Sequence, residues 1–309
     1  MREEEELALV LREDEQLRTG EGWSRIAKGY SGDRLYVGSC DGRRCLLRIY
    51  DGERQAAKQA EYDHLRHFAS RGVRCPEPLK LAMTADRRIG YMLATYIPGE
   101  DGETALPQLS PEAQYAAGLA AGSELRLLHE LAAPPEWPDW YEAKAAKHRR
   151  YVEQYRSCGV RLPGGDAVLA YIERHLDAMR GRPNLFQHDD YHPGNLVFRD
   201  GAFAGVVDFG RWDWGDPVHE FLKVGMFTVE TSIPFAIGQI RGYHDGREPD
   251  EAFWRLYALY MAMAVVSSVA WVVRFHPQET DEMLVRLGRV LDDHQGFELE
   301  RPSWADIVG

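Results

Sequence analysis

The sequence predicts an α+β protein with two lobes, a small one containing an antiparallel sheet and a larger, mostly helical one. Between residues 26 and 97, β-branched and aromatic residues gather between turn signals, as is typical of strands. Beyond residue 103 most apolar stretches have a helical period instead. With 309 residues, of which 44% are hydrophobic and 28% charged, the chain is long enough for two globular domains.

The first lobe is expected to span residues 1–98. Its strands are separated by turn sequences such as Ser-Gly-Asp and Cys-Asp-Gly, and its longer helix places Tyr62, Leu65 and Phe68 on one side. The segment 98–103 has loop chemistry and no apolar period, so it is expected to join the lobes. Strands are expected at 26–30, 35–39, 44–50, 80–84 and 88–97, and helices at 4–17 and 53–70.

The second lobe is expected to span residues 99–309. Its stretch 256–273 carries no charge and approaches the length of a membrane span, but it contains two Tyr, a Trp and a Ser pair. Amphipathic acidic sequence on both sides favours a buried core helix over a membrane span. Helices are expected at 110–131, 139–157, 165–180, 217–229, 232–244, 250–274 and 279–294, with a β region at 185–208.

The net charge of −12 is concentrated in the second lobe. Residues 1–98 carry 17 basic and 16 acidic side chains, whereas residues 99–309 carry 20 basic and 33 acidic ones. Such acidity argues against nucleic-acid binding, which depends on clustered Lys and Arg. An acidic second lobe is either a solvated helical surface or a face suited to a cationic small molecule.

The first residues and the cysteines indicate a cytoplasmic protein. MREEEELALV has neither the basic nor the apolar region of a secretory signal. The four cysteines form no CxxC motif and no Cys/His cluster, so they are expected to be reduced thiols.

The strongest chemical signal is Gln187-His-Asp-Asp-Tyr-His-Pro-Gly-Asn195, followed by Asp208-Phe-Gly210. Its His-x-Asp-x-x-x-x-Asn spacing is that of a phosphotransferase catalytic loop, and Asp-Phe-Gly is the metal-binding partner of such a loop. The alternative, in which Asp190 and Asp208 are only turn and cap residues, leaves the pairing of the two motifs unexplained.

Local geometry predicts that the two motifs converge. Asp200-Gly201 is a favoured type I′ hairpin turn between strands at 196–199 and 202–207. Symmetric pairing about that turn sets Asn195 opposite Val206 and leaves Asp208 just past the end of the ladder, beside Asn195. A carboxylate and an amide oxygen are ligands suited to Mg²⁺, and Asp190 precedes Asn195 by five residues on the same loop.

These residues resemble the aminoglycoside phosphotransferase and choline kinase-like family, whose loop typically reads His-Gly-Asp-Leu-His-Pro-Gly-Asn. The resemblance implies a protein-kinase-like fold, ATP or GTP as phosphate donor, and Mg²⁺. It makes Asp190 the catalytic base and Asn195 and Asp208 catalytic Mg²⁺ ligands, with His188 structuring the loop and Asp216 a structural anchor. Protein kinases fit less well, because the Gly-rich GxGxxG loop, the VAIK strand and an APE motif are absent.

The resemblance also assigns a nucleotide site in the first lobe. The segment 26–36 resembles the family's phosphate-covering loop, in which small residues let backbone N–H groups approach phosphates. The third strand carries Arg48 where the family has Lys, and Glu61 is its expected partner. Arginine can fill that role through its planar fork, although the shape differs. The remaining nucleotide contacts are expected at Gly29, Ser31 and Gly32 for the phosphates and near Thr95 and Ile97 for adenine.

The acceptor is less well specified by the sequence. We expect a small-molecule hydroxyl, most simply on a cationic aminoglycoside antibiotic, because carboxylates near the loop would pair with its ammonium groups. Asp213, Glu220 and Glu230 are the candidates, and Trp212 or Trp214 could stack on a sugar. Two alternatives stay open: a kinase for a macrolide, choline, homoserine or a sugar amine, and a non-catalytic nucleotide-binding scaffold, which Arg48 motivates.

Overall fold

The structure is a computed structural model that describes residues 3–26 and 32–307. Its contacts form two compact units, the first comprising residues up to Gly99 together with Ala204–Arg211, and the second Glu100–Phe203 and Trp212 onward. The expected boundary lay between residues 98 and 99, and the sequence did not indicate that 204–211 belongs with the first unit.

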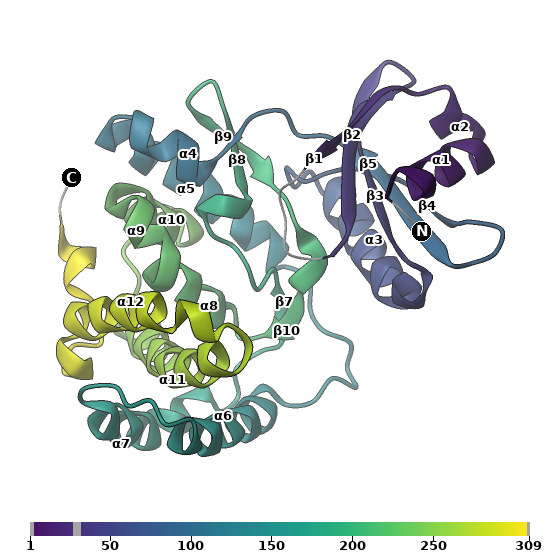
Figure 1. The fold of residues 1–309 in the computed structure, drawn as a ribbon. Coiled ribbons are helices and arrows are strands. Elements are labelled where there is room, and N and C mark those ends of the chain that lie inside the picture. The colour runs from purple at the N-terminus through teal and green to yellow at the C-terminus, as the bar shows by residue number, and fades with distance from the viewer. Residues whose placement is uncertain (1–2, 27–31, 308–309) are drawn as a thin grey trace. The chain divides into compact units, whose positions relative to one another are not determined.

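The first unit is built on a five-stranded antiparallel sheet of order β1-β2-β3-β5-β4 (Figure 1). The expected strand at 26–30 begins earlier, and its residues 27–30 lie outside the described part of the chain. The strands are β1 Glu21–Ile26, β2 Arg34–Cys40, β3 Arg43–Asp51, β4 Pro78–Met83 and β5 Ile89–Thr95.

The helices of this unit are α1 Glu3–Glu13, α2 Glu15–Arg18 and α3 Gln55–Ser70. The expectation of one helix over 4–17 is wrong, because Asp14 interrupts it. The extended backbone of Asp14 lets its carboxylate accept the N–H groups of Gln16 and Leu17, which caps the second helix. Asp14 also accepts a hydrogen bond from the Tyr91 hydroxyl at 2.7 Å, and this bond ties the helix start to the sheet.

Alternation along β3 decides which side chains meet α3. Cys45, Leu47 and Ile49 join a buried cluster with side chains of α1 and α2. Residues between them in sequence point to the other face of the sheet, where α3 lies (Figure 1). Arg48 is therefore directed at α3, and this placement brings it to Glu61.

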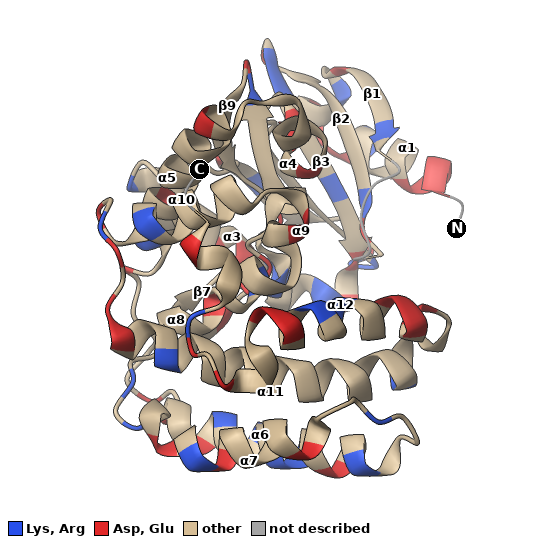
Figure 2. Ribbon diagram, turned by 90° about the vertical axis from the view of Figure 1, so that its left-hand side faces the viewer, with Lys and Arg blue, Asp and Glu red and all other residues tan. Residues whose placement is uncertain are grey.

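The second unit is mostly helical, and α11 forms its core. Fifteen residues of α11 are buried, on nearly every side of the helix. The helix is long and apolar enough to cross a membrane by length and composition, and 72% of its most apolar window is buried inside the structure. Figure 2 shows α11 almost free of charge, whereas α6 and α7 carry both signs. The longer helices are α5 Pro111–Leu128, α6 Trp140–Ser157, α7 Gly165–His175, α10 Ile233–Tyr243, α11 Glu251–Phe275 and α12 Thr280–Asp293.

Helices α5 and α10 approach each other closely because glycines line their contact. A Cβ atom at Gly122 would lie 2.0 Å from the carbonyl oxygen of Gln239, and one at Gly242 would lie 2.1 Å from that of Leu119. No larger residue fits at this distance without moving a helix. The crossing matters for function, since the carbonyl oxygen of Ala121 on α5 anchors the loop that contains Asp190.

The structure corrects two local expectations and adds one strand that the sequence did not predict. The segment 98–103 is not a plain loop: β6 Glu100–Asp101 pairs with β8 Leu196–Arg199, and α4 Gly102–Ala105 follows. A short strand, β10 Asp213–Gly215, pairs with β7 Leu185–Gln187 although no period marked it. The helix expected at 217–229 is broken into α8 Pro217–Glu220, a π-helical turn at Val224–Thr228 and α9 Val229–Thr231.

Candidate functional site

The loop that carries Asp190 follows β7 and is fixed at both ends. Tyr191 is fully buried, and its hydroxyl donates to the carbonyl oxygen of Ala121 at 2.8 Å. His188 is also fully buried, and its ring lies 5.8 Å from that of Tyr191. Asp189 between them has φ 58°, a left-handed backbone that Asp tolerates better than most residues. The packing of His188 and Tyr191 therefore fixes the direction of the Asp190 side chain, which lies between them in sequence.

Asp190 lies in a ring of hydrogen-bond donors. Its Oδ1 accepts from Nζ of Lys223 at 2.9 Å, and its Oδ2 accepts from Nδ2 of Asn195 at 3.2 Å. The imidazole Nε2 of His192 lies 3.7 Å from Oδ1. The side chains of Asp190 and Lys223 are only 15% and 14% exposed, so little water screens their interaction.

The electrostatics keep Asp190 ionised. Burial alone would raise the pKa of this carboxyl, but the contact with His192 and the positive charge of Lys223 outweigh it and hold the pKa well below its usual range. An ionised carboxylate is the form that can accept a proton from a substrate hydroxyl.

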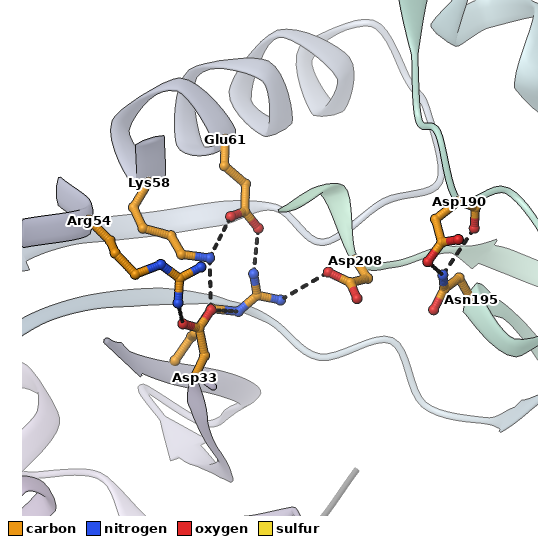
Figure 3. Close-up of polar contacts among 8 residues, drawn as sticks. Asp33, Arg54, Lys58, Glu61, Asp190, Asn195 and Asp208 are labelled. Atoms are coloured by element: carbon orange, nitrogen blue, oxygen red, sulfur yellow. Dashed lines mark hydrogen bonds and ion pairs between the residues drawn. The ribbon is translucent and has the colours of Figure 1, made fainter. Parts of the chain in front are cut away.

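Asn195 faces Asp190 with its amide nitrogen. Nδ2 donates both to the carboxylate and, at 2.9 Å, to the backbone carbonyl of Asp190. With both N–H groups used, the amide oxygen is left for a ligand, and Figure 3 shows it on the side away from Asp190. The sequence-based placement of Asp190 and Asn195 on one loop thus becomes a direct contact between them.

Asp208 belongs to the first unit and lies just after strand β9. β9 Ala202–Val206 stops just before it, and its φ of 65° turns the chain into the short helix Phe209–Arg211. Phe209 is buried, with its ring 5.9 Å from that of Phe68 on α3. This contact anchors the turn, while the Asp208 side chain stays 41% exposed and open to a ligand.

Arg48 bridges Asp208 and Glu61. Its guanidinium donates to Oε1 of Glu61, and its Nη2 lies 4.0 Å from Oδ1 of Asp208 (Figure 3). Burial lowers the pKa of this guanidinium, but Glu61, Asp208 and Asp33 more than compensate and raise it. The expected pairing of Arg48 with Glu61 is present in the structure.

Two further cations, neither expected from the sequence, complete this network. Lys58 donates to Glu61 at 2.8 Å and lies 2.7 Å from Oδ2 of the buried Asp33. Arg54 also pairs with Asp33. Lys58 precedes Glu61 by three residues on one helix, a spacing that could have indicated the pair. Nothing local linked Asp33 to either residue.

The structure describes only some of the residues expected to contact the nucleotide. Gly29 and Ser31 lie outside the described residues, and Gly32 has φ 70°, which favours glycine. Thr95 ends β5 with its N–H bonded to Glu77. Within the described ranges 3–26 and 32–307, no hydrogen bond uses the backbone of Ile97. These backbone contacts to adenine stay predictions.

Each of the three carboxylates expected to bind an acceptor has a polar contact within the protein. Asp213 accepts the backbone N–H of Trp214 at 2.8 Å. Glu220 is buried, accepts the N–H of Asp189 at 3.2 Å and lies 3.7 Å from a ring nitrogen of His129. Glu230 accepts from Arg286 at 3.0 Å. Each carboxylate therefore has a partner within the protein, and their role toward an acceptor stays a prediction.

Among the residues that the structure describes, no group of three or more His, Cys, Asp or Glu side chains could hold a metal ion. The predicted Mg²⁺ ligands do not form such a group, because one of them is an asparagine. Asn195 lies in the second unit and Asp208 in the first, so their convergence on one ion stays a prediction of the hairpin geometry.

Fold and site together define a class, that of small-molecule kinases with a two-lobe, kinase-like architecture. A profile of the Phosphotransferase enzyme family (APH) matches residues 22–257, and the chain belongs to this family. A search of curated protein sequences finds no match.

Solved structures of several aminoglycoside phosphotransferases have a similar fold. The GDP complex of an aminoglycoside 2′-phosphotransferase-IIIa variant has a TM-score of 0.68 at 14% identity, covering 96% of this chain and 99% of that one. A thermostable APH(4)-Ia variant with ADP and hygromycin B has a TM-score of 0.63 at 17% identity, covering 93% and 97%. The streptomycin–ATP complex of APH(2″)-IIa has a TM-score of 0.60 at 15% identity, covering 94% and 96%.

Proposed function

We propose that this enzyme transfers the γ-phosphate of ATP to a hydroxyl group of a small molecule, with Asp190 as the base. The acceptor oxygen bonds to the γ-phosphorus as the bond to the β–γ bridging oxygen breaks. The hydroxyl proton goes to Asp190, and ADP leaves. Phosphoryl transfer of this kind depends mainly on positioning and on charge neutralisation.

The observation that carries this proposal is the environment of Asp190. Its carboxylate is ionised, and each oxygen is oriented by a donor, Lys223 on one side and Asn195 on the other. A carboxylate serving only as a turn or cap residue needs no such pair of donors. The fixed orientation favours a base that meets the acceptor hydroxyl in a single geometry.

The residues also suit the Mg²⁺ that the family implies. Asn195 has its amide oxygen free of the Asp190 contact, and Asp208 presents a carboxylate that is nearly half exposed. Such a pair of oxygen ligands is typical of Mg²⁺ that is completed by water and phosphate oxygens. Bound there, the ion would neutralise charge on the phosphates.

Arg48 is proposed to hold the phosphates in place of the usual lysine, and its replacement tests this role. Arg48→Met should lower kcat/KM for ATP by about 10- to 100-fold, because hydrogen bonds to charged groups contribute about 1.5–3 kcal/mol. Arg48→Lys should recover part of that loss. The measurement is initial rate against ATP concentration.

Arg44→Met is the matched control for Arg48. Arg44 lies on the same strand, is exposed, and stacks on Tyr96 with its guanidinium 4.7 Å from the ring centroid. It should leave kcat/KM for ATP within twofold of the wild type. Equal kcat/KM in Arg48→Met and the wild type would exclude Arg48 from the phosphate site.

For the acceptor, the sequence favours an aminoglycoside, with the 33 acidic side chains of residues 99–309 as support. The structural neighbours add support, because two of them were solved with hygromycin B and streptomycin. The internal partners of Asp213, Glu220 and Glu230 weaken the argument. Acceptors of different charge therefore belong in the same test.

The experiment is γ-phosphate transfer from labelled ATP with Mg²⁺ across aminoglycosides, macrolides, choline and homoserine. Transfer to one chemical class, absent in the Asp190→Asn protein, is the expected result. Binding of Mg-ATP without transfer to any acceptor would favour the nucleotide-binding scaffold instead. Failure to bind ATP at all would contradict both functions.

A further inference from the structure

The segment 219–223 lies between helix α6 and the loop of Asp190. Three of its residues contact either the helix or the loop. His219 accepts from Nζ of Lys144 on α6, and Glu220 accepts the backbone N–H of Asp189 at 3.2 Å. Lys223 then donates to Asp190 at 2.9 Å. These contacts place Lys144 next to the segment that holds the loop of Asp190, although it lies far from that loop in sequence.

Lys147 adds a second cation to the same face of α6, three residues after Lys144. Its charge acts on both Lys144 and Asp189. Burial, followed by the nearby Lys147, lowers the pKa of Lys144 to about 7. Lys144, Lys147 and Lys223 all oppose protonation of the buried His219. Positive charge thus accumulates next to the catalytic loop, within a unit whose overall charge is negative.

The two lysines of α6 differ from Lys223 in their ion pairing. Lys223 has Asp190, but no ion pair within residues 3–26 and 32–307 involves Lys144 or Lys147. Asp189 and Asp213 are near enough to favour the charged form of Lys144, yet neither lies within 4.0 Å of it. The contacts of Lys144 are an imidazole and the ring of Trp140, 5.4 Å away.

An unpaired, half-buried ammonium group is costly unless a ligand supplies its partner. A polycation in this place would face three lysines, and it would find Glu220 already bonded to the Asp189 N–H. An anion would instead form ion pairs with Lys144 and Lys147. The charge near Lys144 and Lys147 therefore favours an anionic acceptor, whereas the overall charge of the lobe favours a cationic one.

We propose that the acceptor carries a carboxylate or phosphate group near its reactive hydroxyl, and that Lys144 and Lys147 bind this group. The proposal rests on the phosphotransferase function proposed above and narrows the class of acceptor. Lys144 and Lys147 orient the acceptor, Asp190 takes the proton, and Lys223 holds Asp190 in position.

The first test uses sulfate as a small anionic probe, with the full chain saturated with AMP-PNP and Mg²⁺ so that the nucleotide site is filled. Calorimetric titration should detect sulfate binding, weakened at least tenfold in Lys144→Met and also weakened in Lys147→Met. Arg150→Met is the matched control, because Arg150 is an exposed cation of the same helix, and it should bind sulfate as the wild type does. Titration with malonate then distinguishes a carboxylate site from one for tetrahedral anions.

Lys147 is exposed, so its variant should fold even if Lys144→Met does not. No sulfate binding in the wild type would overturn the proposal. Equal sulfate affinity in the lysine variants and in Arg150→Met would also overturn the proposal, because the bound sulfate would then be an adventitious ion only.

The second test follows the acceptor itself. Among acceptors that are phosphorylated, those with a carboxylate or phosphate should be preferred, and Lys147→Met should raise their KM about tenfold while the KM for ATP is unchanged. Phosphorylation of an uncharged or cationic acceptor with the same KM in Lys147→Met would overturn this inference and leave the phosphotransferase function standing. Loss of ATP binding in the wild type would instead count against the function itself.

Discussion

Replacing Asp190 by Asn should abolish phosphate transfer while ATP binding is retained. An amide cannot take the acceptor proton, and loss of a positioned general base typically lowers kcat by about 10²- to 10⁴-fold. The amide can still accept a hydrogen bond from Lys223, which now donates to the carboxylate at 2.9 Å, so the loop should keep its shape. Single-turnover transfer from labelled ATP and calorimetric ATP binding measure the two properties separately.

Asp200→Asn is the matched control for this variant. Asp200 undergoes the same chemical change at the tip of the β8–β9 hairpin, where its side chain is exposed. Its φ of 53° is tolerated by Asn, so both activity and folding should be unchanged. If Asp190→Asn kept more than a tenth of the wild-type kcat, Asp190 would not be the base.

Replacing Asp216 by Ala should destabilise the second unit by up to about 3 kcal/mol, because it breaks an ion pair whose carboxylate is fully buried, while the Arg182 side chain, 32% exposed, can still be partly hydrated. The Asp216 carboxylate is fully buried. It accepts two hydrogen bonds from Arg182, at 2.7 and 2.9 Å, and a third from the Tyr260 hydroxyl at 2.7 Å. It also caps α8 through the N–H of Val218. Urea unfolding followed by tryptophan fluorescence measures the effect.

The exposed pair of Asp177 with Arg180 provides the comparison. Asp177 accepts from Nε of Arg180 at 2.7 Å, but both side chains are more than half exposed. Asp177→Ala should cost less than about 1 kcal/mol, as exposed ion pairs typically do. A loss of similar size in Asp216→Ala would mean that Asp216 does not anchor the unit.

The sequence predicted those features whose cause is local. Asp200-Gly201 indicated a tight hairpin turn, and both residues have the positive φ that such a turn needs. The expected partner of Arg48 on the following helix, Glu61, does meet it, because alternation along β3 directs Arg48 to the face of the sheet that α3 covers. The spacing of Asp190 and Asn195 predicted a catalytic loop, and the structure joins the two side chains by a hydrogen bond.

The sequence did not predict contacts between residues that are distant along the chain, because no local periodicity indicates them. The strand at 213–215 is too short to show alternation, and it exists because β7 pairs with it. The acidic total of residues 99–309 suggested a cationic acceptor, but net charge does not say where each carboxylate finds its partner. Glu220 and Glu230, for example, are bonded to Asp189 and Arg286.

By itself, the sequence determined the class of fold and the type of enzyme, a small-molecule kinase, and it predicted the residues of the catalytic loop, because each rests on residue patterns within a few dozen positions. Only the tertiary structure decided what surrounds Asp190. Lys223 reaches it across 33 residues, and Lys144 meets His219 across 75. Helix packing sets such contacts, and they place positive charge beside the proposed base in an otherwise acidic lobe.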